Sequence, residues 1–407
     1  MKITHIVPRF WPQFDGLGDY ARMLGRHLQE ESGIESRFLV GDPAWRASSG
    51  DFPDGTSLEI TAVSQQTVAG LLERLQGVET VVLHYVGYGY HNRGIPFWIN
   101  RAMKTWKQSS PAHRLIVVFH ELWASGPPWK SECYLGWIQR RLVRELHDLC
   151  DLSVASVPLA LRRLQALRRK ETILHPVPCN MGSESGHSRK WHKGGPVRLA
   201  LFGMPTQREI SLKSHLRLVA ALHEAGLVEA VNVIGKDARS GDDPSNEVRI
   251  LRGILPEERI HIVSNATPER AGQALAESDL LLSFYPSRWL FKSGSSMAAL
   301  ANGAIPVLPE GRDLEILAEG REILVCSGEK SSIAGILSQI QKPGGLGTIA
   351  RGGYDWYWAH ADWPILTRKL AAALERLTNC GAQKNDKSRL ATVGGTPLIP
   401  TQGRMEK

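Results

Sequence analysis

The strongest restriction on the fold comes from residues 280–308, which read as strand, polar loop, helix and strand. Apolar residues 280–284 predict a buried strand, small apolar residues 295–302 predict a helix, and residues 305–308 predict a second strand. Gly303 follows the predicted helix and supplies the left-handed residue that commonly ends one. This order is a βαβ unit of a parallel sheet, and such sheets bind ligands at the carboxyl ends of their strands.

The loop of this unit combines groups that can bind an anion. Gly294, Ser295 and Ser296 place backbone N–H groups and two hydroxyls at the predicted helix start, with Lys292 beside them. Helix N-termini attract phosphate groups. A helix whose serines only cap its own first turn explains the same residues. On these residues alone, both interpretations stay open.

The alternation of strands and helices runs through most of the chain, and 407 residues are too many for one compact core. We therefore predict an α/β protein with two Rossmann-like domains, residues 1–181 and 197–355, joined by a polar linker at 182–196. Residues 356–379 predict a helix that crosses back to the first domain. Residues 380–407 lack apolar periodicity and predict a disordered tail.

Bulk composition narrows the partners and the compartment. The net charge of +8 suits anionic ligands, but the sequence has no long Lys/Arg run and no nucleic-acid motif, so we expect no nucleic-acid partner. Five widely spaced cysteines indicate a reducing cytosol rather than disulfides or a zinc site. No apolar run reaches the roughly 20 residues of a membrane span. We expect a cytoplasmic protein that also contacts the inner face of an anionic membrane peripherally.

Two glycines follow the first predicted strand, residues 3–7. Gly16 and Gly18 allow the backbone to turn sharply and to approach a ligand. Ala21 stands where the dinucleotide fingerprint has its third glycine, which disfavours a nicotinamide cofactor without excluding an oxidoreductase.

A second informative point is the strand predicted over residues 115–119, because it delivers His120 and Glu121 to its carboxyl end. A lone histidine is more often structural, whereas a His-Glu pair at this position is a candidate for chemistry. Aromatic and polar residues near the same strand ends are candidates for contact with a sugar ring, or for packing only. These residues are Asp19, Tyr20, Tyr85, Tyr88, Glu121 and Trp123.

The second predicted domain opens with a strand at residues 197–202 that ends in Gly203. Arg208 and Lys213 follow on a predicted helix and can point back toward an anion at the strand end. Two cations near a loop are also common on a solvated surface.

These motifs together resemble the GT-B glycosyltransferases, in particular the retaining, nucleotide-sugar-dependent family 4 that includes bacterial polysaccharide and lipopolysaccharide enzymes. The resemblance rests on the glycine motif at 15–19, the Phe119-His120-Glu121 strand end, the Arg208/Lys213 pair and the segment 279–306. It implies two Rossmann-like domains that face each other across a cleft. It also implies a hexosyltransferase that moves a sugar from a nucleoside-diphosphate sugar to a glycan or lipid-linked acceptor.

The resemblance also assigns roles to residues. His120 would face the transferred sugar, and Arg208, Lys213 and Lys292 would stabilise the leaving diphosphate. The donor would lie against Gly16, Gly18, Gly203, Gly294, Ser295 and Ser296. We expect no metal and no other cofactor, because no D-x-D follows a predicted strand and Asp242-Asp243 reads as surface loop.

One departure from the family pattern keeps other functions open. The family segment carries two glutamates eight positions apart, and Leu290 and Ala298 stand in their places here. A GT-B protein that binds a nucleotide sugar or glycan without catalysis is therefore an alternative, and a sugar epimerase of the same fold is a weaker one.

Overall fold

The computed structural model describes residues 1–12, 16–46, 58–124, 131–181, 191–236, 244–311, 314 and 316–393, with side chains described up to residue 378. Two parallel sheets dominate it, one of seven strands and one of six. The α/β class predicted from the sequence is confirmed.

The first sheet has the strand order β3-β2-β1-β4-β5-β6-β7, and all its neighbouring strands are parallel. Its strands are β1 (Lys2–Val7), β2 (Glu35–Val40), β3 (Glu59–Ala62), β4 (Thr80–Tyr85), β5 (Arg114–Phe119), β6 (Leu152–Ala155) and β7 (Thr172–Leu174). The central strands β1, β4 and β5 are buried along almost their whole length because both faces of a parallel sheet are covered, and they are mostly apolar except for polar residues such as His5 and His84.

Six helices of the first half accompany this sheet. They are α1 (Gly16–Ser32), α2 (Val68–Arg74), α3 (Gly87–Tyr90), α4 (Phe97–Ser109), α5 (Ser131–Leu149) and α6 (Pro158–Leu167). Apolar residues of α2, α4, α5 and α6 pack in one core cluster with one face of the sheet. Leu24 and Leu28 of α1 pack with Ile3, Val82 and Val118 on the other face.

The second sheet has the order β10-β9-β8-β11-β12-β13. Its strands are β8 (Val197–Phe202), β9 (Val228–Gly235), β10 (Ile260–Ser264), β11 (Leu280–Leu282), β12 (Ile305–Leu308) and β13 (Leu324–Val325). Its helices are α7 (Pro205–Ser214), α8 (Leu216–Glu224), α9 (Asn246–Arg252), α10 (Pro268–Ala276), α11 (Gly294–Asn302), α12 (Lys330–Gln341) and α13 (Gly345–His360), with 3₁₀ turns η1 (Glu257–Arg259) and η2 (Ser287–Lys292).

The helix α11 confirms the unit predicted over residues 280–308. It begins at Gly294 after β11 and ends at Gly303, whose φ of 71° is left-handed, and β12 follows directly. The short turn η2 occupies the loop between β11 and α11. This loop therefore has a fixed shape at the carboxyl end of the sheet.

The two domains pack directly on each other. Leu290 and Phe291 of η2 belong to the same core cluster as Val157 and Ala160 of the first domain, and the Val177 N–H donates to the carbonyl of Phe291 over 2.8 Å.

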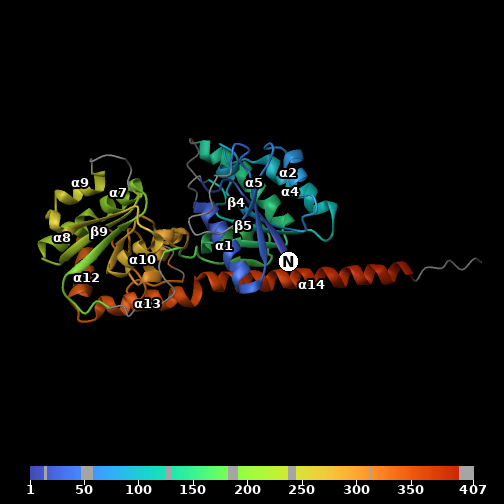
Figure 1. Cartoon of the computed structure of the whole chain (residues 1–407). Helices are drawn as coiled ribbons and strands as arrows, with labels where there is room; N and C mark the ends of the chain where they lie inside the picture. The colour runs from blue at the N-terminus through green and yellow to red at the C-terminus, as the bar shows by residue number, and fades with distance from the viewer. Residues whose placement is uncertain are drawn as a thin grey trace, which may run out of the picture.

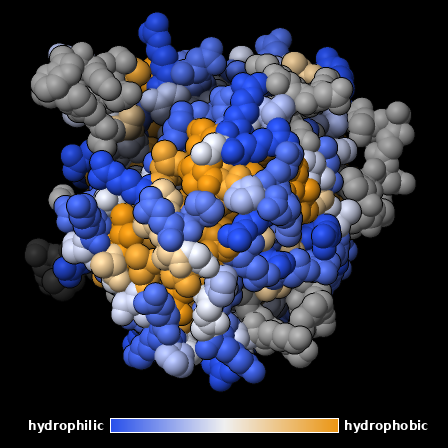
Figure 2. All heavy atoms as spheres, turned by 90° about the vertical axis from the view of Figure 1, so that its left-hand side faces the viewer, coloured by the Kyte–Doolittle hydropathy of each residue, from blue (hydrophilic) through white to orange (hydrophobic). Residues whose placement is uncertain are grey.

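Figure 2 views the molecule from the side of the second domain. Apolar side chains gather in the middle of this face, with hydrophilic side chains around them.

The last helix, α14 (Trp363–Val393), returns to the first domain and runs along its base (Figure 1). Trp363 is 3% exposed, its ring N–H donates to the carbonyl of Cys179 over 3.1 Å, and Leu366 and Leu370 pack against the α1 face. The helix continues to Val393, into the range predicted as a disordered tail. Helix propensity can continue a helix where an apolar face is absent, and the sequence prediction had looked for such a face.

Several elements differ from the sequence prediction. The glycines at 16 and 18 lie in the first turn of α1 and not in a loop before it. The elements β3, α2, α9 and α13 were not predicted, because they are short or rich in glycine and polar residues. The predicted domain boundary at residues 355 and 356 falls inside the continuous helix α13.

Candidate active site between the domains

A pocket of about 420 Å³ lies between the two domains. The start of α1, the end of β5 and the segment after β7 line it from the first domain. Gly203, Gln207, Tyr285, Lys292, Gly294 and Ser295 line it from the second. The residues come from the carboxyl ends of parallel strands in both sheets, the position at which such sheets bind ligands.

His120 and Glu121 follow β5 and line this pocket, as predicted from the sequence. The Glu121 carboxylate pairs with the Lys292 ammonium across the domain boundary at 2.5 Å, with side-chain exposures of 46% and 33%. This ion pair connects the β5 end of the first domain to η2 of the second. The structure therefore brings together His120, Glu121 and Lys292.

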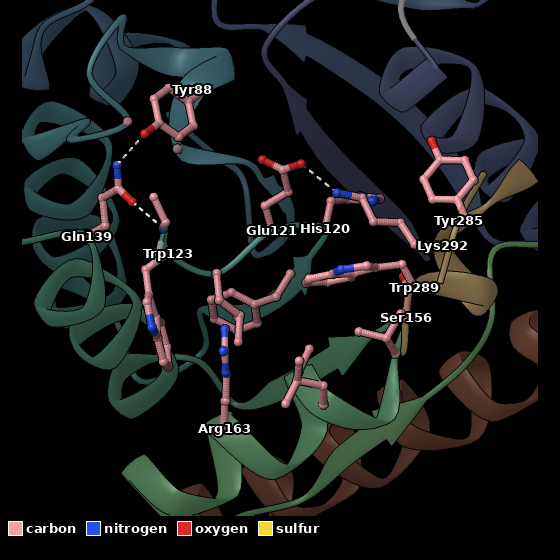
Figure 3. Close-up of a pocket in the computed structure, with 18 residues that line it drawn as sticks. Tyr88, His120, Glu121, Trp123, Gln139, Ser156, Arg163, Tyr285, Trp289 and Lys292 are labelled. Carbon is pink, nitrogen blue, oxygen red and sulfur yellow. Dashed lines mark hydrogen bonds and ion pairs between the residues drawn. The ribbon is translucent and has the colours of Figure 1, made fainter. Parts of the chain in front are cut away.

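A second pocket of about 500 Å³ adjoins the first and lies mostly within the first domain (Figure 3). His120, Glu121, Tyr285 and Lys292 line both pockets. Aromatic and polar side chains surround the second pocket, and they include Tyr88, Trp123, Gln139, Arg163 and Trp289. The Arg163 guanidinium lies over the Trp123 ring at 5.4 Å from its centroid. The site is thus two neighbouring pockets with a shared wall.

The start of α11 faces the pocket between the domains through Gly294 and Ser295. Ser293 caps the helix by accepting from the Ser296 N–H over 3.2 Å. Among the described residues, the N–H groups of Gly294 and Ser295 have no hydrogen-bond partner. They remain free to meet an anion.

Ser296 does not face the pocket, contrary to the prediction. Its side chain is fully buried and its hydroxyl bonds to Ser293 Oγ at 2.9 Å and to Ser283 Oγ at 3.2 Å. Ser296 belongs to the internal cap of α11, as the capping interpretation predicts, and anion binding at Gly294 and Ser295 stays a prediction.

Arg208 is also not in the pocket. It is 1% exposed, its guanidinium pairs with the Glu247 carboxylate at 2.7 Å, and it donates to the carbonyls of Gly203 at 2.7 Å and Lys236 at 3.1 Å. The helix α7 starts at Pro205, so Arg208 points beneath the strand ends toward α9. Arg208 therefore fixes the loops of the second domain and does not face a ligand in this structure.

Lys213 lies one turn further along α7 and also misses the pocket. Its ammonium pairs with Glu209 at 2.6 Å and its side chain is 59% exposed. Gly203, in contrast, lines the pocket as predicted and has a φ of 134°, a conformation that side chains rarely adopt.

The two glycines of α1 have different roles. Gly16 lines the pocket and has open space around it. A Cβ at Gly18 would lie 2.9 Å from the carbonyl oxygen of Arg9, so Gly18 permits α1 to pack against the segment after β1. Asp19 and Tyr20 line the pocket, and the Tyr20 ring meets the His120 ring edge-on at a centroid distance of 5.0 Å.

Tyr85 is a core residue and contacts neither pocket. It is fully buried on the face of the first sheet that packs against α4 and α5, and its hydroxyl has no hydrogen-bond partner in the described part of the chain. Tyr88 is 45% exposed and lines the second pocket, where its hydroxyl accepts from the Gln139 amide over 3.1 Å. Tyr88, Glu121 and Trp123 therefore lie as predicted at the strand ends.

The two positions where the resembled family has glutamates are apolar core here. Leu290 is 2% exposed and Ala298 is 1% exposed. The carboxylates among the described lining residues of the pocket between the domains are Asp19 and Glu121, both from the first domain.

Sequence reasoning missed several residues that line the pockets. Tyr285 follows β11 closely, so its position after a strand was a usable signal. Gln139 and Arg163 lie on helices α5 and α6, and nothing in the local sequence distinguishes them from other surface residues of those helices.

His120 is the first of three neighbouring histidines, and the other two, His84 and His5, lie buried in the first sheet. His120 Nε2 lies 3.2 Å from His84 Nδ1, and His84 Nε2 lies 3.0 Å from His5 Nδ1. Burial lowers the pKa of His5 to about 3, and burial followed by the charge of Lys292 lowers the pKa of His120 to about 3. Burial, and then the two neighbouring imidazoles, hold the pKa of His84 well below its usual range. All three rings are neutral at neutral pH.

These lowered pKa values predict that acid destabilises the protein. Below about pH 6.5 the unfolded imidazoles bind protons that the folded ones do not, so the free energy of unfolding falls as pH falls, by about 1.4 kcal/mol per pH unit for each such ring. Urea unfolding at several pH values between 7.5 and 5 measures the slope. A His84→Phe variant should show a shallower slope than the wild type. Equal slopes would mean that His84 titrates normally.

Within the described ranges, no group of three or more His, Cys, Asp or Glu residues is arranged to hold a metal ion. Metal independence stays a prediction. Among the helices of the described residues, none is long and apolar enough to cross a bilayer.

No protein-family model matches this sequence, and no curated protein matches it. Solved structures do resemble the chain. Sucrose-phosphate synthase from Thermosynechococcus elongatus is 14% identical, with a TM-score of 0.63 over 93% of this chain and 99% of its own. Anabaena HepE in complex with UDP and glucose is 13% identical, with a TM-score of 0.58 over 92% of this chain and 100% of its own. WaaG, a glycosyltransferase involved in lipopolysaccharide biosynthesis, is 14% identical, with a TM-score of 0.55 over 91% and 98%.

These structures cover nearly the whole chain and both domains. The chain therefore has the GT-B architecture of two Rossmann-like domains, as the resemblance in the sequence predicted. At these identities the likeness concerns the fold, and function has to be argued from the site.

Proposed function

We propose that this protein is a glycosyltransferase that moves a hexose from a nucleoside-diphosphate sugar to a glycan or lipid-linked acceptor, with retention at the anomeric carbon. The observation that carries the proposal is the pair of neighbouring pockets that share His120, Glu121 and Lys292 in their walls. One pocket suits a donor, the other an acceptor, and the shared wall is where a sugar would pass between them.

The donor is assigned to the pocket between the domains. Transfer builds negative charge on the departing diphosphate, and preorganised cations and amides stabilise such charge. Lys292 and the free N–H groups of Gly294 and Ser295 supply both on one side of this pocket. The HepE structure, which holds UDP and glucose, supports a nucleotide sugar as the ligand class for this fold.

The acceptor is assigned to the second pocket. Trp123 and Trp289 offer flat faces on which sugar rings can stack, and Tyr88 and Gln139 offer polar contacts at the rim. His120 stands at the junction, where it would contact the transferred sugar. We further propose that the acceptor proton leaves on the donor phosphate and that no metal is needed, because Lys292 and the α11 amides supply the charge stabilisation.

The test is calorimetry with UDP, GDP and ADP, followed by product analysis with the corresponding nucleotide sugars. Binding of one nucleotide and a glycosylated product support the proposal. Binding of none of the three would contradict it. Binding without turnover on any acceptor would favour the non-catalytic binder, which the buried Leu290 and Ala298 keep as the second candidate. Interconversion of two free nucleotide sugars would indicate the epimerase.

We also propose that the first domain touches an anionic membrane at the cytoplasmic face, in the synthesis of a bacterial surface polysaccharide. Tyr134 and Trp137 of α5 are 72% and 69% exposed, and Arg141 and Arg144 continue the same stripe at helical spacing. Their side chains are 69% and 62% exposed. Exposed aromatic residues beside cations suit the headgroup region of an anionic bilayer.

A Trp137→Ser variant is expected to bind vesicles containing phosphatidylglycerol on the order of tenfold more weakly than the wild type, because one large apolar side chain no longer inserts. Sedimentation with the vesicles measures the change. Ile262→Ser is the matched control, because Ile262 is 50% exposed on β10 of the other domain. Equal losses in both variants, or none in Trp137→Ser, would contradict this contact.

A further inference from the structure

We propose that His84 and His5 are positioning residues that hold His120 in one tautomer, with its Nε2–H bonded inward and its Nδ1 lone pair presented to the pockets. The inference rests on the proposed function, because it assigns to His120 the part of a hydrogen-bond acceptor for a sugar hydroxyl. The evidence for it, however, is the internal geometry of the first sheet.

Four polar side chains cross the sheet in a diagonal row. His5 on β1 pairs with Val82 of β4, and His84 lies two residues after Val82. His84 in turn pairs with Val118 of β5, and His120 lies two residues after Val118, directly beyond the end of β5. Phe38 on β2 pairs with His5, and Ser36 lies two residues before Phe38. Residues two apart on a strand share a face. The topology therefore sets Ser36, His5, His84 and His120 side by side on the face of the sheet that α1 covers.

The atoms of this row are within hydrogen-bond distance at every step. Ser36 Oγ lies 3.2 Å from His5 Nε2, and the next two steps measure 3.0 and 3.2 Å. Successive imidazoles stack with ring planes 26° and 22° apart. His5 and His84 are fully buried. The row thus runs from the half-buried Ser36 hydroxyl through the core to the active-site pockets.

A row of neutral imidazoles has only two arrangements of its protons. Each ring carries one N–H and one lone pair, and each step needs one of each. All N–H groups therefore point toward the pockets or all point away from them. A hydroxyl can donate or accept, so Ser36 permits both directions.

The charges at the pocket end select the direction. The ammonium of Lys292 acts on His120, and a cation favours a facing lone pair over a facing N–H. Glu121 is bonded to Lys292 and would favour the opposite direction, but of these two charges only that of Lys292 contributes to the lowered pKa of His120. The other titratable groups near His120 are Tyr20, whose ring meets His120 edge-on, and Tyr285, which lines both pockets. Both are neutral phenols at neutral pH, so they do not favour either direction by charge. We therefore assign the Nε2–H tautomer to His120, His84 and His5, with His5 Nε2–H donating to Ser36 Oγ.

This arrangement gives His120 a defined role at the junction of the pockets. Among the described residues, His120 Nδ1 has no hydrogen-bond partner, so its lone pair is available to a ligand hydroxyl. The two buried histidines would hold the ring in place and prevent the tautomer exchange that an isolated imidazole undergoes.

The test is long-range ¹H–¹⁵N correlation spectroscopy of the protein labelled at its histidine nitrogens, at pH 7.5 and without substrate. Nε2–H signals are expected for all three rings. A His84→Phe variant should leave His120 as a mixture of tautomers, and His84→Gln, whose amide can accept and donate, should restore the single tautomer at least in part. An Nδ1–H form, a charged ring or a mixture at His120 in the wild type would overturn the inference.

Activity provides the second measurement. His84→Phe should lower the turnover number about tenfold with little change in the dissociation constant of the nucleotide, because His84 touches no ligand, and His84→Gln should recover part of the rate. His147→Phe is the control, since His147 is equally buried and bonded to Ser153 Oγ but lies on the other face, near α5 and β6. Equal rate losses in His84→Phe and His147→Phe would reduce His84 to a packing residue. Failure to find any transferase activity would remove the proposed function while the spectra still decide the tautomer.

Discussion

A Lys292→Ala variant is expected to lose most of its sugar-transfer activity, with a fall in the turnover number of roughly 10²- to 10³-fold. Lys292 is the only Lys or Arg among the described residues that line the pocket between the domains. Its removal takes away the cation that would neutralise the leaving diphosphate. It also leaves the Glu121 carboxylate unpaired beside that diphosphate. Steady-state kinetics with the nucleotide sugar found by calorimetry provide the measurement.

Lys213→Ala is a matched control for this substitution. Lys213 also pairs with a glutamate, at 2.6 Å, but it lies on the surface of α7 outside both pockets. We expect wild-type kinetics from it. If Lys292→Ala retained full activity, the assignment of the diphosphate to this pocket wall would be wrong. An equal loss in both variants would mean that the net charge of the protein, and not the position of Lys292, determines the rate.

The elements that the sequence predicted best are those in which one physical signal dominates. Strands β8 and β12 were placed to the residue because short, mostly apolar runs between turn residues have few other solutions in a parallel sheet. His120, Glu121 and Gly294 were found because the carboxyl ends of strands converge on one edge. The local order of residues was enough to place all three at the pocket.

The errors arose where orientation depends on distant parts of the chain. His84 and Tyr85 are neighbours at the end of β4, yet they face opposite sides of the sheet, so only one of them can reach the row of histidines. Arg208 was interpreted as a phosphate ligand because it follows the first strand of the second domain and because the resembled family keeps an Arg/Lys pair there. Its partner Glu247 is on α9, a helix that the sequence did not reveal, 39 positions further along the chain. No local sequence pattern predicts the ion pair between Arg208 and Glu247.

An Arg208→Ala variant is accordingly expected to unfold more easily rather than to lose nucleotide affinity. Removing one partner of a buried ion pair costs about 3–5 kcal/mol, because the remaining charge stays buried without compensation. Glu247 is fully buried, and its second carboxylate oxygen has no hydrogen-bond partner among the described residues. Without Arg208, the carbonyls of Gly203 and Lys236 also lose their donor. Urea unfolding measures the loss.

The double variant Arg208→Met/Glu247→Leu tests whether the instability of Arg208→Ala comes from the Glu247 carboxylate that is left without its partner. Replacing both charges with apolar side chains removes the buried carboxylate, so the double variant should be more stable than Arg208→Ala. Nucleotide binding, measured by calorimetry on folded protein without denaturant, should stay near the wild-type value in both variants, because Arg208 lines neither pocket. An Arg208→Ala protein with wild-type stability and no nucleotide binding would instead restore the phosphate role that the sequence suggested. The guanidinium would then have to leave Glu247 when the donor binds, and the buried pair would be its resting position.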